Sequence, residues 1–448
     1  MKKPTNPIPR LRKALRSLYD RATDRVKGFG KQTDEVLSGE PIDYSAPSIP
    51  YYENLANRLS FVRVVLYMVL FVFVVVTVIS NHRLITYENL YYLAKDIGAA
   101  TLTAQSQADT VSYPISSSEA DFALYRGGVV ISGCEVVTVM SGSGRQTLSD
   151  NVAYASPCVE ASDKYCVTFG RGEKSFSVYN AFVRVHTETT DFPVYDAAVG
   201  DNGYFAIVTR SRDYKSEVIL YDGEMDRLAN YHLNGYVTGI SMNDEGDRLG
   251  VVSVESQNGL WVTKITIIRI EKRISEESAV ISGSFGSACG FLAEDRFAVM
   301  LSDRLMVLKS DATVVSEVSF GASVPTLSSM GKGYVAVLTK ADDDLSETVL
   351  KVYDRNGRPA YDVTMGADHP IRKAGGATAM ALGDNVLFIR AGDTLFRVSG
   401  NGTDMASAVI SRDTLAILPY SGDEVTVCTP AYAYRLEKED FILIKNDR

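Results

Sequence analysis

The sequence predicts an all-β protein, a β-propeller carried on one N-terminal transmembrane helix. Three observations lead to this prediction: an apolar run at residues 61–79, a surplus of basic residues before it, and a strand-turn-strand pattern that returns through residues 122–448. We therefore expect a basic cytoplasmic arm and linker (1–60), a transmembrane helix (61–80), a juxtamembrane helix and linker (81–121) and an extracytoplasmic propeller (122–448).

The arm at residues 1–60 has the pattern of a basic amphipathic helix followed by a linker. Its apolar residues form one stripe at helical spacing: Leu11, Leu15, Leu18, Ala22, Val26 and Phe29. Basic residues fall mostly off this stripe, as in helices that lie on an anionic inner leaflet. The alternative is that the charges only set the orientation of the chain and the arm has no fixed structure. Residues 41–60 begin with Pro and Ser and are expected to be a linker.

The apolar run at residues 61–79 has the length of a membrane span. Its nineteen residues, with Arg63 as the only charge, would rise about 28 Å as a helix, close to the hydrocarbon thickness of a bilayer. A cleaved signal peptide is disfavoured, because the run starts at residue 61 and no small-x-small cleavage site follows it. A buried core helix is disfavoured because the run has no polar face.

The distribution of charge predicts the orientation. Residues 1–80 hold twelve Lys and Arg against seven Asp and Glu, a net charge of +5, and the remaining residues hold 34 against 48, a net charge of −14. Basic segments are retained in the cytoplasm, so we expect a single-pass protein of the cell membrane with its C-terminal domain outside. An acidic outer domain disfavours nucleic acid as a partner and favours envelope or membrane proteins or neutral glycans.

Residues 81–121 are expected to connect the span to the propeller. Residues 85–100 have apolar side chains at helical spacing, and residues 110–115 have the pattern of a weak strand.

The repeat is recognised by its turns and its alternating strands. Gly, Asn and Asp adopt the positive φ that tight hairpins need, and Val, Ile, Tyr and Phe suit a half-buried pleated surface. A turn of this kind and an apolar strand are followed by a second turn and strand in each unit. The first turns lie near residues 126, 163, 202, 246, 295, 332, 384 and 422. Their mean spacing is roughly 42 residues, in the range of propeller blades.

A β-propeller explains this period because one blade cannot bury both faces of its own sheet, whereas a closed ring of blades can. Eight blades are favoured, and seven would result if the first and last units combined into one blade. Either residues 110–115 or residues 441–445 could supply the strand that closes the ring. A series of β-sandwiches is disfavoured, because no linker-like break interrupts the pattern.

Four segments carry a resemblance to a known family: ENLYYLAKDI (88–97), VSYPIS (111–116), FALYRGGVVISG (122–133) and VMSGSGR (139–145). In these segments and in its layout the chain resembles a family of single-pass, membrane-anchored β-propeller proteins of clostridia and related Gram-positive bacteria, classified as a domain of unknown function. The resemblance implies an anchored propeller that faces outward. It implies no catalytic residue.

No catalytic, cofactor-binding or metal-binding residue is assigned from the sequence. The histidines are His82, His186, His232 and His369, and they form neither HExxH nor a ligand pair at i, i+4. GxSxG, Walker and strand-linked GxGxxG motifs are also missing from the sequence. The cysteines are Cys134, Cys158, Cys166, Cys289 and Cys428. Most have apolar neighbours and are expected to be small buried side chains, although Cys158 and Cys166 could pair across a hairpin.

Some residues leave alternatives open. Asp342, Asp343 and Asp344 are either a calcium-binding loop or an ordinary hairpin tip. Trp261, the only tryptophan, belongs either to a contact surface or to the core.

The sequence favours a non-catalytic, membrane-anchored scaffold or sensor of the cell envelope that binds a protein or another ligand. The alternative is an extracytoplasmic propeller enzyme that acts on sugars or envelope glycans. Its acids would come from a set of four candidates: Asp191, Asp196, Asp303 and Asp393.

Overall fold

A computed structural model describes most of the repeat region and a short N-terminal part of the chain. The described residues are 59–60, 62–73, 75, 112–114, 119–270, 275–341, 348–399, 402–420 and 422–444. The chain divides into two compact units, residues 1–86 and residues 87–448.

In the first unit, residues 59–60, 62–73 and 75 are helical and exposed. Within the described residues, no helix has both the length and the apolar character that crossing a membrane requires. Several residues of the predicted span, namely 61, 74 and 76–80, lie outside the described part. The predicted helices in the arm and at residues 85–100 also lie outside it.

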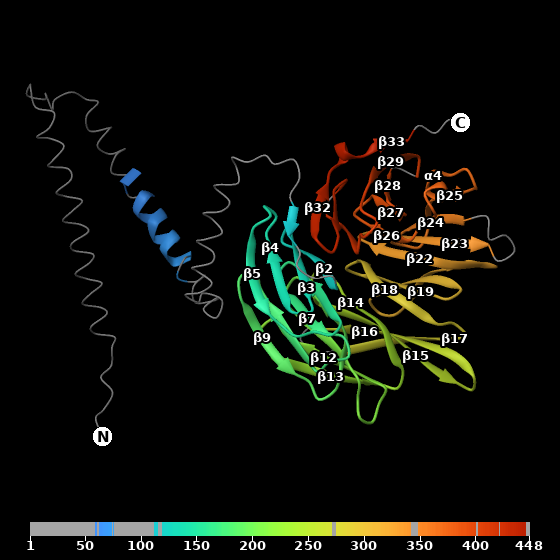
Figure 1. Cartoon of the computed structure of the whole chain (residues 1–448). Helices are drawn as coiled ribbons and strands as arrows, with labels where there is room; N and C mark the ends of the chain where they lie inside the picture. Colours follow the sequence, from blue (N-terminus) through green and yellow to red (C-terminus); the bar gives the residue numbers. More distant parts are fainter. Residues whose placement is uncertain are drawn as a thin grey trace, which may run out of the picture. The chain divides into compact units, whose positions relative to one another are not determined.

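The second unit is an eight-bladed β-propeller (Figure 1). Each blade contains four antiparallel strands in chain order, with two exceptions: the last blade takes its outer strand from β1, and blade 7 has a fifth strand, β33. The first strands of successive blades contact one another, and β30 of the last blade contacts β2 of the first. The first strands therefore form the inner wall of a closed ring. The expectation of eight blades is confirmed, and the seven-blade alternative is wrong.

The first four blades cover residues 120–282. Blade 1 contains β2 (Ala120–Tyr125), β3 (Gly128–Gly133), β4 (Val136–Met140) and β5 (Gln146–Asn151). Blade 2 contains β6 (Pro157–Ala161), β7 (Cys166–Gly170), β8 (Ser175–Tyr179) and β9 (Arg184–Thr189). Blade 3 contains β10 (Val194–Val199), β11 (Phe205–Thr209), β12 (Ser216–Tyr221) and β13 (Arg227–Leu233). Blade 4 contains β14 (Tyr236–Met242), β15 (Arg248–Gln257), β16 (Leu260–Arg269) and β17 (Ser275–Ser282).

The other four blades complete the ring. Blade 5 contains β18 (Gly286–Ala293), β19 (Arg296–Leu301), β20 (Arg304–Lys309) and β21 (Val314–Ser319). Blade 6 contains β22 (Ser323–Gly331), β23 (Tyr334–Ala341), β24 (Thr348–Asp354) and β25 (Pro359–Met365), and the short helix α4 (Pro370–Lys373) follows it. Blade 7 contains β26 (Ala379–Leu382), β27 (Leu387–Ala391), β28 (Thr394–Ser399) and β29 (Asp404–Val409). Blade 8 contains β30 (Ala416–Pro419), β31 (Val425–Cys428) and β32 (Tyr432–Leu436), followed by the 3₁₀ turn η1 (Lys438–Asp440) and β33 (Ile442–Leu443).

The ring is closed by β1 (Ser112–Pro114), which pairs antiparallel with β32 and completes the sheet of blade 8. Of the two candidate closing segments, the one at residues 110–115 is therefore correct. The other candidate, residues 441–445, instead contributes β33, which adds a fifth strand to the outer edge of blade 7.

The apolar core lies between the blades. Among the described residues it divides into eight clusters, and each cluster combines side chains from two neighbouring blades. Between blades 2 and 3, for example, Phe176 lies edge-on to Phe205 and Tyr221, whose rings stack 4.6 Å apart. The cluster between blades 8 and 1 contains Phe122 and Cys428. Each blade thus depends on both of its neighbours to cover its faces.

A polar contact supports the junction of blades 8 and 1. The guanidinium group of Arg435 lies 4.0 Å from the ring centre of Tyr420 and donates a hydrogen bond of 2.8 Å to the carbonyl oxygen of Gly127. Gly127 has φ +77°, and a Cβ there would lie 2.8 Å from the Tyr420 hydroxyl. Only glycine fits both the backbone and the space at this position.

The interface between blades 4 and 5 provides a test of this packing. Gly250 in β15 faces the ring of Phe297 in β19, so that the methyl group of Gly250→Ala would overlap the ring. We expect this substitution to reduce the free energy of unfolding by about 1–3 kcal/mol, because the packed neighbours must shift. Gly366→Ala is the matched control, since no atom lies within 4 Å of its added methyl group. Urea unfolding of both variants would contradict the account if Gly250→Ala were as stable as Gly366→Ala.

Candidate functional site

The four acids considered for an enzyme do not form one site. Asp191 is an exposed residue between β9 and β10. Asp303 is paired with Arg304 and accepts a hydrogen bond from the Ser284 hydroxyl at 2.6 Å. Asp393 is paired with Arg412 at 3.2 Å. Only Asp196, in β10, belongs to the inner wall of the ring.

Asp196 is one of three carboxyl groups on the first strands of consecutive blades. Asp121 lies in β2, Glu160 in β6 and Asp196 in β10. One oxygen of Asp121 accepts a hydrogen bond of 2.9 Å from the backbone N–H of Val159, which links blades 1 and 2. We call these three residues the inner acidic group.

The pKa values of the inner acidic group reflect its position at the ring centre. Burial, followed by the charges of Asp196 and Asp121, raises the pKa of Glu160 to about 8. Burial also raises the pKa of Asp196 to about 6 and raises that of Asp121. Arg171, in the turn after β7, opposes all three of these shifts. Glu160 is nevertheless exposed to solvent, and solvent screens the effect of the neighbouring charges. Even so, the pKa of Glu160 is raised from its ordinary value of 4.5.

Sequence reasoning missed Asp121 and Glu160, although a signal was present. The first strands of blades 1, 2 and 3 carry one carboxyl group each, whereas β14, β18, β22, β26 and β30 carry none. The inner wall is therefore acidic on one side and uncharged on the other.

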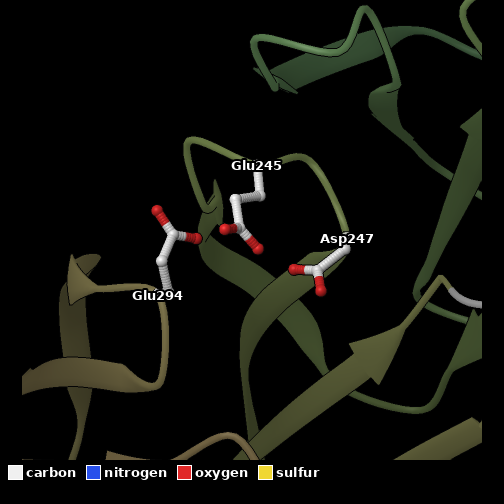
Figure 2. A group of neighbouring side chains, drawn as sticks. All are labelled: Glu245, Asp247 and Glu294. Atoms are coloured by element: carbon white, nitrogen blue, oxygen red, sulfur yellow. The ribbon is translucent and has the colours of Figure 1, made fainter.

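A second acidic group lies between blades 4 and 5 (Figure 2). Glu245 and Asp247 come from the turn between β14 and β15 and Glu294 from the turn between β18 and β19, and their oxygens lie within 4.8 Å of one another. The Asn243 side chain, only 1% exposed, donates to Asp247 at 2.7 Å and to Glu294 at 2.6 Å. These hydrogen bonds give Asp247 and Glu294 a donor from within the protein and tie the two blades together. The alternative calcium loop at Asp342–Asp344 lies outside the described residues.

The histidines and cysteines do not form a site in the described part of the chain. His186 lies 3.3 Å from Glu188, His232 stacks on Tyr214, and His369 caps α4. His82 lies outside the described residues. All five cysteines are free. The expectation of buried side chains is confirmed for Cys158, Cys166 and Cys428, while Cys134 and Cys289 are half-buried.

One end of blade 4 carries exposed apolar side chains. β15 and β16 are ten residues long and are joined by Asn258 and Gly259, which both have positive φ as a type I′ hairpin turn requires. The exposed residues are Tyr236, Leu260, Trp261 and Val280, which the strand register places at the same end of the sheet. We call them the blade-4 tip. Trp261 is 53% exposed and touches Phe285 edge-on, so it belongs to a surface and the core alternative is wrong.

The apolar surface continues beside the blade-4 tip. Phe285 and the exposed Val324 line a cavity of about 370 Å³ between blades 5 and 6. Trp261 contacts Phe285, so the tip and this cavity are joined.

These features define the class of the protein: an eight-bladed β-propeller. The chain belongs to the DUF5711 family, a family of unknown function whose pattern matches residues 103–433. A comparison with curated proteins found no match.

Solved structures share the fold at low sequence identity. Sqt1 of Chaetomium thermophilum, bound to the N-terminus of the ribosomal protein L10, is 10% identical with a TM-score of 0.50, and the match covers 73% of this chain and 98% of that one. BamB from Moraxella catarrhalis is 10% identical with a TM-score of 0.45 over 73% of this chain and 98% of its own. Apo AztD from Citrobacter koseri is 10% identical with a TM-score of 0.47 over 65% and 86%. Identities this low show the fold alone.

The inner acidic group makes a prediction about pH. In the unfolded chain Glu160 ionises near its ordinary pKa of 4.5, whereas in the folded protein its pKa is about 8. Between these values the folded state retains a proton that the unfolded chain has lost, so stability falls as the pH rises. We expect Glu160→Gln to remove this loss and to stabilise the protein at pH 8 by about 1 kcal/mol, a value reduced for solvent screening.

Urea unfolding between pH 4 and pH 9 measures this effect. Glu277→Gln, which changes an exposed carboxylate on β17, is the control and is expected to leave the pH profile unchanged. A Glu160→Gln profile that parallels the wild type, or that lies below it at pH 8, would contradict the assignment.

Proposed function

We propose that this chain is a non-catalytic scaffold or sensor in the envelope of a Gram-positive bacterium. One helix at residues 61–80 anchors it in the cell membrane, residues 1–60 face the cytoplasm, and the propeller lies outside. The support for this placement is the apolar run and the change in net charge from +5 to −14 across it. The partner class is an envelope or membrane protein.

The blade-4 tip is the observation that carries the binding role. Trp and Tyr side chains dominate the energetics of protein interfaces, and clustered exposed apolar residues mark contact surfaces. Leu260 and Trp261 lie on the longest hairpin among the described strands, beside the cavity that Phe285 lines. A partner that covers this tip would bury an aromatic anchor together with the apolar surface around it.

One observation favours the alternative, an extracytoplasmic enzyme acting on sugars or glycans. Burial and the charge of Asp196 raise the pKa of Glu160 to about 8, and a carboxyl group with a raised pKa near a second carboxyl group is the arrangement of glycoside hydrolases. The tip is the stronger argument, because acidic groups at a ring centre also serve structure, as the Asp121 link to blade 2 illustrates.

A cysteine placed beside the tip tests both the location and the binding role. Intact cells that express full-length Gln257→Cys, an exposed position paired with Leu260 that leaves Trp261 in place, would be treated with a membrane-impermeant maleimide that carries a photocrosslinker. We expect labelling, because the propeller is outside, and then one dominant crosslinked envelope protein after illumination. Val409→Cys is the matched control, since Val409 is an 83% exposed apolar residue on β29, far along the chain in blade 7.

The two readouts separate the two parts of the proposal. The control is expected to be labelled equally but to yield no dominant adduct, and unmodified cells give the background from the native cysteines. If neither variant were labelled until the cells were lysed, the orientation would be wrong. If both were labelled and gave the same adducts, the tip would not be a specific binding surface.

A further inference from the structure

A cavity of about 430 Å³ lies between blade 6 and the segment that leads to blade 7. Its walls come from β22, β23, β24 and β25 on one side and from α4 and the following loop on the other. This volume falls in the range of small-molecule sites, roughly 300–1,000 Å³.

Local interactions hold the α4 side of the cavity in place. The backbone N–H of Ile371 is capped by His369, and Pro370 occupies the first turn of α4. The helix ends at Lys373 and is followed by Gly375 and Gly376, whose φ values of +107° and +81° favour glycine. Ile371 is buried in the core cluster that joins blades 6 and 7. The cavity is therefore part of the packed structure of the ring.

The cavity is apolar on its floor. Leu338, Met365 and Ile371 are buried side chains that line it, and all three belong to the same core cluster. The apolar part of a ligand in the cavity would contact these side chains and would be buried away from water.

The edge of the cavity is cationic. Lys340 and Arg372 line it, and among its lining residues there is no carboxylate. The described part of the chain offers neither of them an ion pair within 4 Å, whereas the adjacent Lys373 is paired with Asp368 at 3.2 Å. The Nη1 atom of Arg372 is buried without a hydrogen-bond partner among the described residues. A buried guanidinium donor without an acceptor is costly, and an anion is the acceptor that it binds best.

We propose that this cavity binds a small organic anion, with a carboxylate or phosphate group at Arg372 and Lys340 and an apolar body against Leu338, Met365 and Ile371. The inference does not depend on the membrane anchor or on the blade-4 tip. Arg372 supplies a planar set of donors that suits either anion, and Lys340 adds a second positive charge. The two positive charges attract the anion at the cavity, although the chain as a whole carries a net charge of −9.

Two water-soluble probes test the proposal and distinguish the two anions. Isothermal titration calorimetry would measure the binding of 3-phenylpropionate and of phenyl phosphate to the full-length protein in lipid nanodiscs, with empty nanodiscs as the blank. We expect one molecule of at least one probe to bind per chain, with the tighter probe identifying the preferred anion. The neutral analogue 3-phenylpropanol is expected to bind at least about tenfold more weakly, because it lacks the charge.

Variants assign the binding to the cavity. Arg372→Gln is expected to weaken the preferred probe by about tenfold or more, and Lys373→Gln, on the same helix but outside the cavity lining, is expected to bind it like the wild type. Lys340 is an exposed residue, so Lys340→Gln serves as the second variant if Arg372→Gln does not fold. The proposal is wrong if neither probe binds the wild type, or if removing the Arg372 or Lys340 charge has no more effect than removing that of Lys373.

Discussion

The structure depends on the fact that no blade can cover both faces of its own sheet. The middle strands are buried on both sides, as in β7 and β11, so every blade needs a neighbour on each face. The eight apolar clusters are therefore shared, one at each junction between blades. A ring built this way has to close, and closure brings Ser112–Pro114 against Tyr432–Leu436, more than 300 residues later in the chain. The Arg435 contact with Tyr420 and Gly127 strengthens the same junction.

Closure of the ring also decides where function can arise. The first strands converge, which brings the carboxyl groups of Asp121, Glu160 and Asp196 together at the centre although about 40 residues separate them in sequence. Elsewhere the blades repeat one another, and the features that distinguish this protein are departures from the repeat. The long β15–β16 hairpin presents Trp261, and the helix α4 after blade 6 creates the cavity lined by Arg372.

Local signals explain why most of the fold could be predicted from the sequence. Turns such as Asn258-Gly259 and alternating apolar strands depend on neighbouring residues, so each of the eight units was visible. The sequence did not decide which segment closes the ring, because β1 and β33 are only three and two residues long. Strands this short are defined by pairing with strands that are distant in sequence. The candidate sites could not be predicted for the same reason, because they depend on residues that are distant in sequence. Asp191, Asp303 and Asp393 lie in turns of separate blades and do not converge. Lys340 and Arg372, in contrast, line one cavity only in the folded ring.

Hydrogen exchange of the full-length protein with Ser112 and Tyr113 both replaced by proline tests the closed ring most directly. Because Pro114 has no N–H group, these replacements remove the remaining backbone donors of β1. If all eight blades form one cooperative unit that depends on this closure, the slowest amides of β7, β11 and the other middle strands lose protection together with those of β32. Faster exchange confined to blade 8, with the other blades as protected as in the wild type, would contradict the account.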